Sequence, residues 1–315
     1  MAKLQLGKSL LIGFAIAIAA LNSLQARVNA ELGFRTEDGF LSALLSITGG
    51  VLILSVVMLV SPKGRKGLRS LPVALREKRL AWWQLLGGIS GAYYAIAQTT
   101  TGIVLGVALF SVAIVAGQTL SSLLMNRLGV GPSGVHQITW PRLIGTLMVL
   151  MSVMLSVGGQ LEADFSVFIA IVPFMAGFGM GWQLAVNGRV RKETDSVLAA
   201  AYLNFSIAAV LLLLIVLVRG FFMGWPESLP IEPWLYTGGF LGAIFIAGSA
   251  FVVARIGVLV LGVAVVAGQL LGAMAIDILA PSPLHPLTVA TVAGVILALV
   301  AVAVASIPGR KILTS

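Results

Sequence analysis

The stretch Gly87-Gly88-Ile89-Ser90-Gly91-Ala92, followed by Ala116-Gly117-Gln118, occurs a second time in this chain. Its second copy is Gly238-Gly239-Phe240-Leu241-Gly242-Ala243, followed by Ala267-Gly268-Gln269. In both copies 30 positions separate the first glycine from the glycine before the glutamine, from 87 to 117 and from 238 to 268. Two ordered motifs that recur at an offset of 151 residues, in a chain of 315, predict that a unit of half this length was duplicated.

The composition is that of an integral membrane protein. Apolar residues make up 59% of the chain and charged residues 10%, and the mean hydropathy is +1.06. A soluble domain has roughly 45–50% apolar and 25% charged residues. The apolar runs are continuous and long enough for helices that cross a hydrocarbon core of about 30 Å, and they do not alternate as barrel strands do. We therefore predict an all-α fold with ten transmembrane helices, at roughly 9–28, 40–60, 82–100, 103–124, 140–158, 167–187, 197–218, 234–252, 257–278 and 286–306.

Lysine and arginine are distributed unevenly between the two sides of this predicted bundle. If the N-terminus is cytoplasmic, 17 of the 20 lie on the cytoplasmic side, and only Arg27, Arg35 and Arg219 lie on the other. Such a bias predicts a multi-pass protein of the cytoplasmic membrane with both termini in the cytoplasm. Each half holds an odd number of helices, so the second half enters the membrane from the opposite side. We divide the chain into a first five-helix repeat (1–158), an external linker (159–166) and an inverted second repeat (167–315).

Several classes of function find no support in these residues. The chain has no cysteine, its two histidines are isolated, and no paired carboxylates or phosphate-binding glycine loop are visible. We therefore expect no metal, no cofactor and no enzyme activity. The net charge of +9 lies mainly in loops, so we expect no nucleic-acid partner. The loop Lys63–Arg79 carries seven positive charges against Glu77, and we expect it to lie on the anionic lipids of the cytoplasmic leaflet.

Amide side chains recur at matching places in the two halves. Gln25 and Asn29 match Gln183 and Asn187 at an offset of 158, and a spacing of four places each pair on one helix face. Amides buried in a membrane need partners, so these faces should look into the bundle or into a wet cavity. Two interpretations stay open: the amides hold helices together, or they line the ends of a substrate path.

In each half, the second motif, Ala-Gly-Gln, ends in a glutamine near the middle of its predicted helix. We expect Gln118 and Gln269 either to bond across the pseudo-symmetry axis or to contact a ligand. The motif glycines allow helices to approach closely. We assign this packing role to Gly87, Gly88, Gly91, Gly117, Gly238, Gly239, Gly242 and Gly268.

The two halves differ after the first motif. The first half continues with Tyr93, Tyr94, Gln98 and three threonines, whereas the second offers Ile244, Phe245 and Ser249. We therefore expect any binding site to be asymmetric. The link after this helix is very short, around Thr101-Gly102, and predicts an antiparallel hairpin.

The last helix of each half lacks internal polar groups. We expect helices 140–158 and 286–306 to face lipid or to form a homodimer contact, and the related positions of Gly145 and Gly294 suggest a packing contact. A proton-coupled exporter of cations would need a carboxylate within the membrane. The nearest candidates for coupling are Glu31 and Asp277, both near predicted helix ends; the counterpart of Asp277 is Asn126.

The two glycine motifs, together with Asn126-Arg127-Leu128-Gly129 and Arg142-Leu143-Ile144-Gly145, resemble the YdcZ-type family of inner-membrane exporters in the drug/metabolite transporter superfamily. The resemblance covers nearly the whole chain, once per half, and members of the family often look like single five-helix units. This chain looks like two such units fused. The resemblance implies transport without naming the cargo. The acidic residue associated with the family's Ala-Gly-Gln helix is present only in the second half, as Asp277.

We therefore expect a secondary transporter that moves a small polar or cationic metabolite or drug by alternating access. The alternative is a membrane scaffold or lipid-interacting subunit, which should have a dry, closed bundle with every amide satisfied. The residues expected to contact the substrate are Gln118 and Gln269 at the centre, with Tyr93, Tyr94, Gln98, Trp182, Tyr202, Gln25, Gln183, Asn29 and Asn187 around them.

Overall fold

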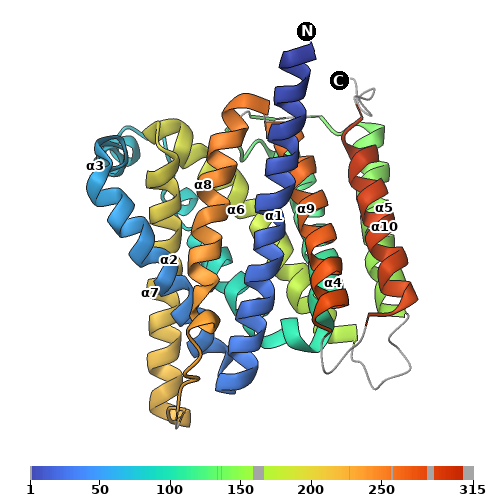
Figure 1. Cartoon of the computed structure of the whole chain (residues 1–315). Coiled ribbons are helices and arrows are strands. Elements are labelled where there is room, and N and C mark those ends of the chain that lie inside the picture. Colours follow the sequence, from blue (N-terminus) through green and yellow to red (C-terminus); the bar gives the residue numbers. More distant parts are fainter. Residues whose placement is uncertain are drawn as a thin grey trace.

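The computed structural model describes residues 2–132, 134–135, 137–158, 167–226, 228–256, 258–281 and 287–307, and these form a bundle of helices without strands (Figure 1). The predicted linker 159–166 lies outside the described residues. The helices are α1 (Ala2–Thr36), α2 (Gly39–Val60), α3 (Pro62–Arg76), η1 (Trp82–Leu85), α4 (Gly88–Leu128), α5 (Trp140–Gly158), α6 (Val167–Thr194), α7 (Val197–Met223), η2 (Pro233–Thr237), α8 (Gly238–Ile256), α9 (Val258–Leu279) and α10 (Val289–Ala305).

The all-α fold with apolar membrane helices is confirmed, but the boundaries differ from the prediction. Helices α1 and α6 run on to Thr36 and Thr194, well beyond the predicted ends at 28 and 187. The basic loop after α2 contains a further helix, α3. The two tryptophans predicted to open a helix at 82 form the short 3-10 turn η1, and α4 begins only at Gly88.

Helix α4 contains two predicted spans, and the hinge between them is not where the sequence placed it. Thr101 and Gly102 are helical; the Thr101 hydroxyl donates to the Ala97 carbonyl at 2.7 Å, as a helical threonine can. The break comes at Gly106, where φ is 72° and ψ is 160°. Only glycine takes this conformation without a steric penalty, which explains why the chain breaks there.

The two arms of α4 run in opposite directions. Just before α4, Arg79 pairs with Glu193 near the C-terminal end of α6 (Nη1 to Oε2, 3.0 Å). Just after α4, the Pro132 carbonyl accepts a hydrogen bond from Lys192 at 3.1 Å, at the same end of α6. Both ends of α4 therefore lie at one end of the bundle, and the chain turns back at the break at Gly106. Figure 1 shows the place of α4 in the bundle.

Helices α1 and α6 are each followed by a turn, and the two turns are equivalent under the repeat. Glu37 and Asp195, 158 positions apart, both have positive φ, 54° and 49°. The next residue caps the following helix in each case: Asp38 accepts from two backbone N–H groups of α2, and Ser196 accepts from Ala199 N. This shared geometry supports an offset of 158 for the first two helices of each half.

Helices from opposite halves pack on one another. Helix α1 lies against α8 and α9, and α6 lies against α4. At Gly268 of α9, a methyl group would overlap the Ile16 carbonyl of α1 and approach Ala19 Cβ to 2.7 Å. At Gly117 of α4, it would overlap the Phe174 carbonyl of α6, and Phe174 is the counterpart of Ile16 at an offset of 158. The halves are thus interleaved by two equivalent backbone contacts.

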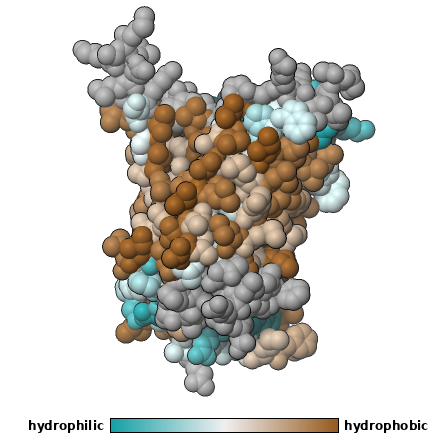
Figure 2. Space-filling model, turned by 90° about the vertical axis from the view of Figure 1, so that its right-hand side faces the viewer, coloured by the Kyte–Doolittle hydropathy of each residue, from teal (hydrophilic) through white to brown (hydrophobic). Residues whose placement is uncertain are grey.

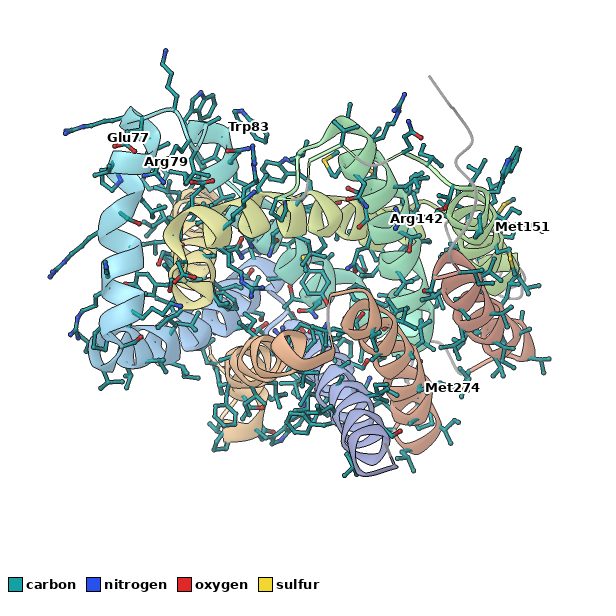
Figure 3. The ribbon with its side chains drawn as sticks, turned by 90° about the horizontal axis from the view of Figure 1, so that it is seen from above. Glu77, Arg79, Trp83, Arg142, Met151 and Met274 are labelled. Carbon is teal, nitrogen blue, oxygen red and sulfur yellow. The ribbon has the colours of Figure 1, made fainter. Side chains whose placement is uncertain are left out.

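Helices α5 and α10 form a pair at the edge of the bundle (Figures 1 and 3). A methyl group on Gly145 would lie 2.6 Å from the Ala301 carbonyl, and one on Gly294 would lie 2.7 Å from the Ser152 carbonyl. These two glycines contact the partner helix within the chain. The opposite side of α5 carries Met151, which is 60% exposed.

The surface has an apolar band between two polar ends (Figure 2). At one end, near α3, Lys63 pairs with Asp195 and Arg79 with Glu77 and Glu193; Figure 3 shows Arg79 beside Glu77. These hydrogen bonds, that to Glu77 above all, raise the pKa of Arg79. At the other end, Arg35 pairs with Glu232 at 2.6 Å. This layering is what a membrane-spanning bundle requires.

The glycine contact between α1 and α9 can be tested within one helix. Gly268→Ala places a methyl group where the α1 backbone lies, and such overpacking typically costs about 1–3 kcal/mol. We expect a clear drop in the thermal unfolding midpoint in detergent. In Gly262→Ala the added methyl group meets nothing within 4 Å, so this variant should unfold at or slightly above the temperature of the unmodified chain. Equal midpoints for the two variants would contradict the contact.

Candidate functional site

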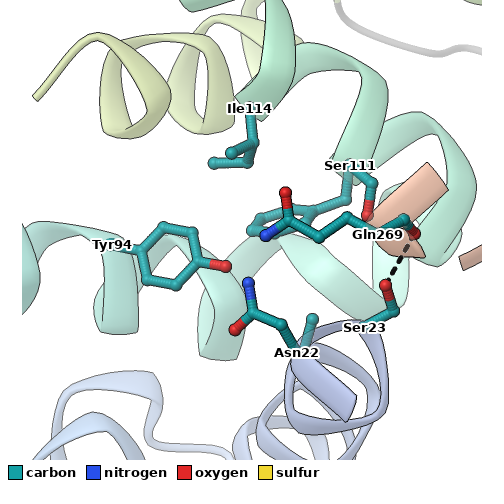
Figure 4. Close-up of a pocket in the computed structure, with 8 residues that line it drawn as sticks. Asn22, Ser23, Tyr94, Ser111, Ile114 and Gln269 are labelled. Atoms are coloured by element: carbon teal, nitrogen blue, oxygen red, sulfur yellow. Dashed lines mark hydrogen bonds between the residues drawn. The ribbon is translucent and has the colours of Figure 1, made fainter. Parts of the chain in front are cut away.

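A small polar cavity lies where α1, α4 and α9 meet (Figure 4). Its volume is about 10 Å³, close to what one water molecule needs. The side chains of Asn22, Tyr94 and Gln269 point toward one another across it. The residues that line it are Asn22, Ser23, Ala26, Tyr94, Phe110, Ser111, Ile114 and Gln269.

Each helix presents its polar groups for a local reason. The Ser23 hydroxyl donates to the Gln269 backbone carbonyl at 2.7 Å, a carbonyl beside the closely packed Gly268. Tyr94 lies on the first arm of α4, and Figure 4 shows its hydroxyl pointing toward the side chain of Asn22. The second arm of α4 begins after Gly106 and supplies Phe110 and Ser111.

One polar atom of the cavity wall is left without a partner. Gln269 Oε1 is buried and accepts no hydrogen bond from the part of the chain that the structure describes. A buried amide oxygen without a partner is unfavourable by about 1–3 kcal/mol. This acceptor is therefore available to a group that enters the cavity.

The cavity is asymmetric with respect to the repeat. Gln118, the counterpart of Gln269, is half-buried on α4 and is not part of the lining. The positions equivalent to Asn22 and Tyr94, at offsets of 158 and 151, are Met180 and Phe245. An equivalent cavity in the second half would lack these polar groups, because the duplicated positions are apolar. A role for Gln118 in substrate binding stays a prediction.

The other amides lie in two separate clusters. In one, Asn29 Nδ2 donates to Gln98 Oε1 at 2.8 Å, and both side chains are almost fully buried. In the other, Asn187 Nδ2 donates to Asn204 Oδ1 at 3.1 Å. Asn204 was not among the residues singled out from the sequence, although its position on α7 matches Ser46 on α2 at an offset of 158.

The motif glycines hold these clusters. A methyl group on Gly87 would lie 2.7 Å from Asn187 Oδ1, and one on Gly238 would overlap Asn29 Oδ1. A methyl group on Gly91 would lie 3.5 Å from Gln183 Oε1. One on Gly242 would lie 3.1 Å from both Nε2 and Oε1 of Gln25. Gly88 and Gly239 lie against the backbone of Asn204 and of Ser46. Every glycine of the first motif thus faces a polar helix of the opposite half.

The three remaining aromatic residues expected to contact a substrate are not part of the cavity lining. Tyr93 is 37% exposed on the outside of α4, and Trp182 and Tyr202 are half-buried on α6 and α7. Their roles in substrate binding stay predictions.

Asp277 has a structural partner that the sequence did not reveal. Its carboxylate accepts hydrogen bonds from Val107 N at 2.9 Å and from Ala108 N at 2.7 Å, and it is 5% exposed. These N–H groups open the second arm of α4, just after the break at Gly106. Asp277 therefore caps a helix from the opposite half, and the positive end of that helix dipole favours its charge. Asn126, its counterpart, is exposed.

Glu31 lies inside α1, within a chain of ion pairs. Its carboxylate is 2.8 Å from Arg35 Nε and 3.6 Å from Arg27 Nη2. Arg35 continues the chain to Glu232 and lies 5.6 Å from the ring centre of Trp234. Both carboxylates therefore already have partners in the protein. A role of Glu31 or Asp277 in coupling stays a prediction.

Comparisons with known proteins support the sequence resemblance. The chain matches the family described as "Putative inner membrane exporter, YdcZ" twice, over residues 10–155 and 168–304. The two matched segments are those expected from a tandem duplication. A solved structure described only as "Crystal structure of protein" has the same fold, with a TM-score of 0.57 and 16% identity over 95% of this chain and 96% of that chain. No curated protein matches.

The cap on α4 can be tested by removing its carboxylate. Asp277→Ala leaves two buried N–H groups without an acceptor, and we expect the free energy of unfolding to fall by about 1–3 kcal/mol. Asp277→Asn retains one acceptor oxygen, so its free energy of unfolding should lie between those of the unmodified chain and Asp277→Ala. Thermal unfolding in detergent measures both. Asn126→Ala, at the equivalent exposed position, is the control; a loss as large as that of Asp277→Ala would argue against the cap.

Proposed function

Because the chain belongs to the YdcZ family of inner membrane exporters, we propose that it is a secondary transporter that works by alternating access. Its cargo in this proposal is a small polar or cationic metabolite or drug, bound in the cavity between α1, α4 and α9. The observation that carries the proposal is the buried Gln269 Oε1, an acceptor on a lining residue that has no partner in the described part of the chain.

Incomplete pairing favours a carrier over a scaffold. Asn29 Oδ1, Gln98 Nε2, Gln183 Oε1 and Gln269 Oε1 are all buried without a partner in the described part of the chain. In a dry bundle that serves only as a support, buried polar groups are expected to be paired. Water or cargo that enters between the helices would satisfy these atoms.

Alternating access would use the equivalence of the two halves. The cavity has room for little more than one water molecule, so a cargo can enter only when one end of the bundle opens. The contact of Gly117 with α6 and that of Gly268 with α1 are equivalent under the repeat. Two such conformations of nearly equal energy, related by exchange of the roles of the halves, are the usual basis of transport by inverted repeats.

We place the end that carries α3 in the cytoplasm, together with both termini. Gly64, Gly67, Leu71 and Ala74 form the buried face of α3, next to α6 and α7, and the basic residues lie on its other faces. This helix would therefore lie flat on anionic lipid headgroups. The proposal includes a homodimer through the exposed side of α5, with Met151 and Met154 at its surface.

The absence of cysteine makes accessibility a clean test of alternating access. Ser111→Cys places one thiol in the cavity wall, and Ser152→Cys places one in the contact between α5 and α10. Both serines are buried, with exposures of 8% and 0%. We expect a small water-soluble thiosulfonate reagent, added to either side of proteoliposomes, to label Ser111→Cys and to leave Ser152→Cys unlabelled. Mass spectrometry measures the labelled fraction.

The pattern of labelling separates the two classes of function. Modification of Ser111→Cys from both sides supports a cavity that opens alternately. If neither variant is modified from either side, the bundle stays closed and the scaffold is the better explanation.

A further inference from the structure

The lining of the central cavity carries hydrogen-bonding groups and no charged side chain. Asn22, Ser23, Ser111, Tyr94 and Gln269 are its polar members, and all are uncharged at neutral pH. We infer that the transported molecule is uncharged and carries hydroxyl or amide groups on a small carbon skeleton. This inference rests on the proposed transport function and narrows its cargo.

Two amide atoms in or near the cavity lack a hydrogen-bond partner, one an acceptor and the other a donor. Gln269 Oε1, on a lining residue, needs a donor. Gln98 lies outside the lining, one helical turn after Tyr94, and its Nε2 has no partner in the described part of the chain and needs an acceptor. A hydroxyl or amide group offers both functions at once. A quaternary ammonium offers neither, an ammonium offers donors only, and a carboxylate offers acceptors only. Neutral polar groups therefore match these atoms best.

The carboxylates of the described membrane helices are already engaged. Asp277 accepts two backbone N–H groups, and Glu31 pairs with Arg27 and Arg35. Asp38 caps α2 and pairs with Arg219. A cation in the cavity would therefore lose its water without gaining an opposite charge, which is strongly unfavourable in a medium of low dielectric constant.

An anion finds no better match. Arg27 follows the lining residue Ala26 in the sequence, but it is not part of the lining, and it pairs with Glu31. Its Nη1 has no hydrogen-bond partner in the described part of the chain, yet any anion there would compete with the Glu31 carboxylate. Arg27 is thus engaged by a carboxylate without a ligand.

The apolar part of the wall suits a carbon skeleton. Phe110 and Ile114 complete the lining, and the rings of Tyr94 and Phe110 are 6.4 Å apart between centres. A few oriented polar groups beside such surfaces are typical of sites for small organic molecules. The tyrosine ring alone could attract a cation, but it would do so without a carboxylate to compensate for the lost water.

The test uses the purified full-length protein in detergent and measures ligand-induced shifts of the unfolding midpoint. The panel contains uncharged probes (erythritol, xylitol and nicotinamide), cations (choline and tetraethylammonium) and anions (lactate and succinate). We expect a saturable upward shift with at least one uncharged probe, since a ligand that binds only the folded state stabilises it. Charged probes should give no saturable shift.

A charge introduced into the lining should reverse this preference. In Gln269→Glu, we expect affinity for the uncharged probe to fall about tenfold or more and a cation to produce a saturable shift. The control is Asn126→Asp, which adds a carboxylate at an exposed position of the first half and should keep the preference of the unmodified chain.

The outcomes separate the inference from the proposed function. Binding of a cation or an anion to the unmodified chain, lost in Gln269→Leu, would overturn the uncharged cargo and leave the carrier intact. Saturable shifts with uncharged probes that persist in Gln269→Leu would place the binding elsewhere and overturn the inference. No shift with any probe, for the unmodified chain and for Gln269→Glu, would overturn both.

Discussion

The structure depends on backbone contacts between helices of opposite halves, at positions where no side chain fits. Between membrane helices the hydrophobic effect supplies little attraction, so close packing and hydrogen bonds must hold them together. Gly117 lets α6 approach the second arm of α4, and Gly268 lets α1 approach α9, the counterpart of that arm. The glycines of the first motif do the same for the amide-bearing helices. Each half thereby becomes part of the packing surface of the other.

Interleaving also explains where the polar cavity lies. Its lining comes from α1 and both arms of α4 in the first half and from α9 in the second. Asp277 fixes the start of the second arm of α4 from the opposite half, so the position of Phe110 and Ser111 depends on both halves. The repeat supplies a symmetric frame, and the difference between the halves at Asn22 and Tyr94, opposite Met180 and Phe245, makes only one side of it polar.

The sequence predicted the membrane class, the long apolar helices and the tandem repeat, because apolar length and motif spacing are local properties. It missed the hinge at Gly106, since a glycine among many others does not reveal which one breaks the helix. It did not reveal the hydrogen bonds of Asp277, because the partners Val107 and Ala108 are 170 and 169 positions away. The offset of 158 relates the turns at Glu37 and Asp195, but the positive φ of these two residues could not be predicted from the sequence.

The central claim is that the two ends of the bundle open in turn, and distances between spin labels test it most directly. Labels at Glu37 and Leu279 report on one end, and the equivalent positions Asp195 and Leu128 report on the other. The four sites are introduced pairwise as cysteines and measured by pulsed electron resonance in nanodiscs. The account predicts that conditions which lengthen one distance shorten the other. Single, unchanged distances at both ends in all conditions, or a joint increase, would contradict it.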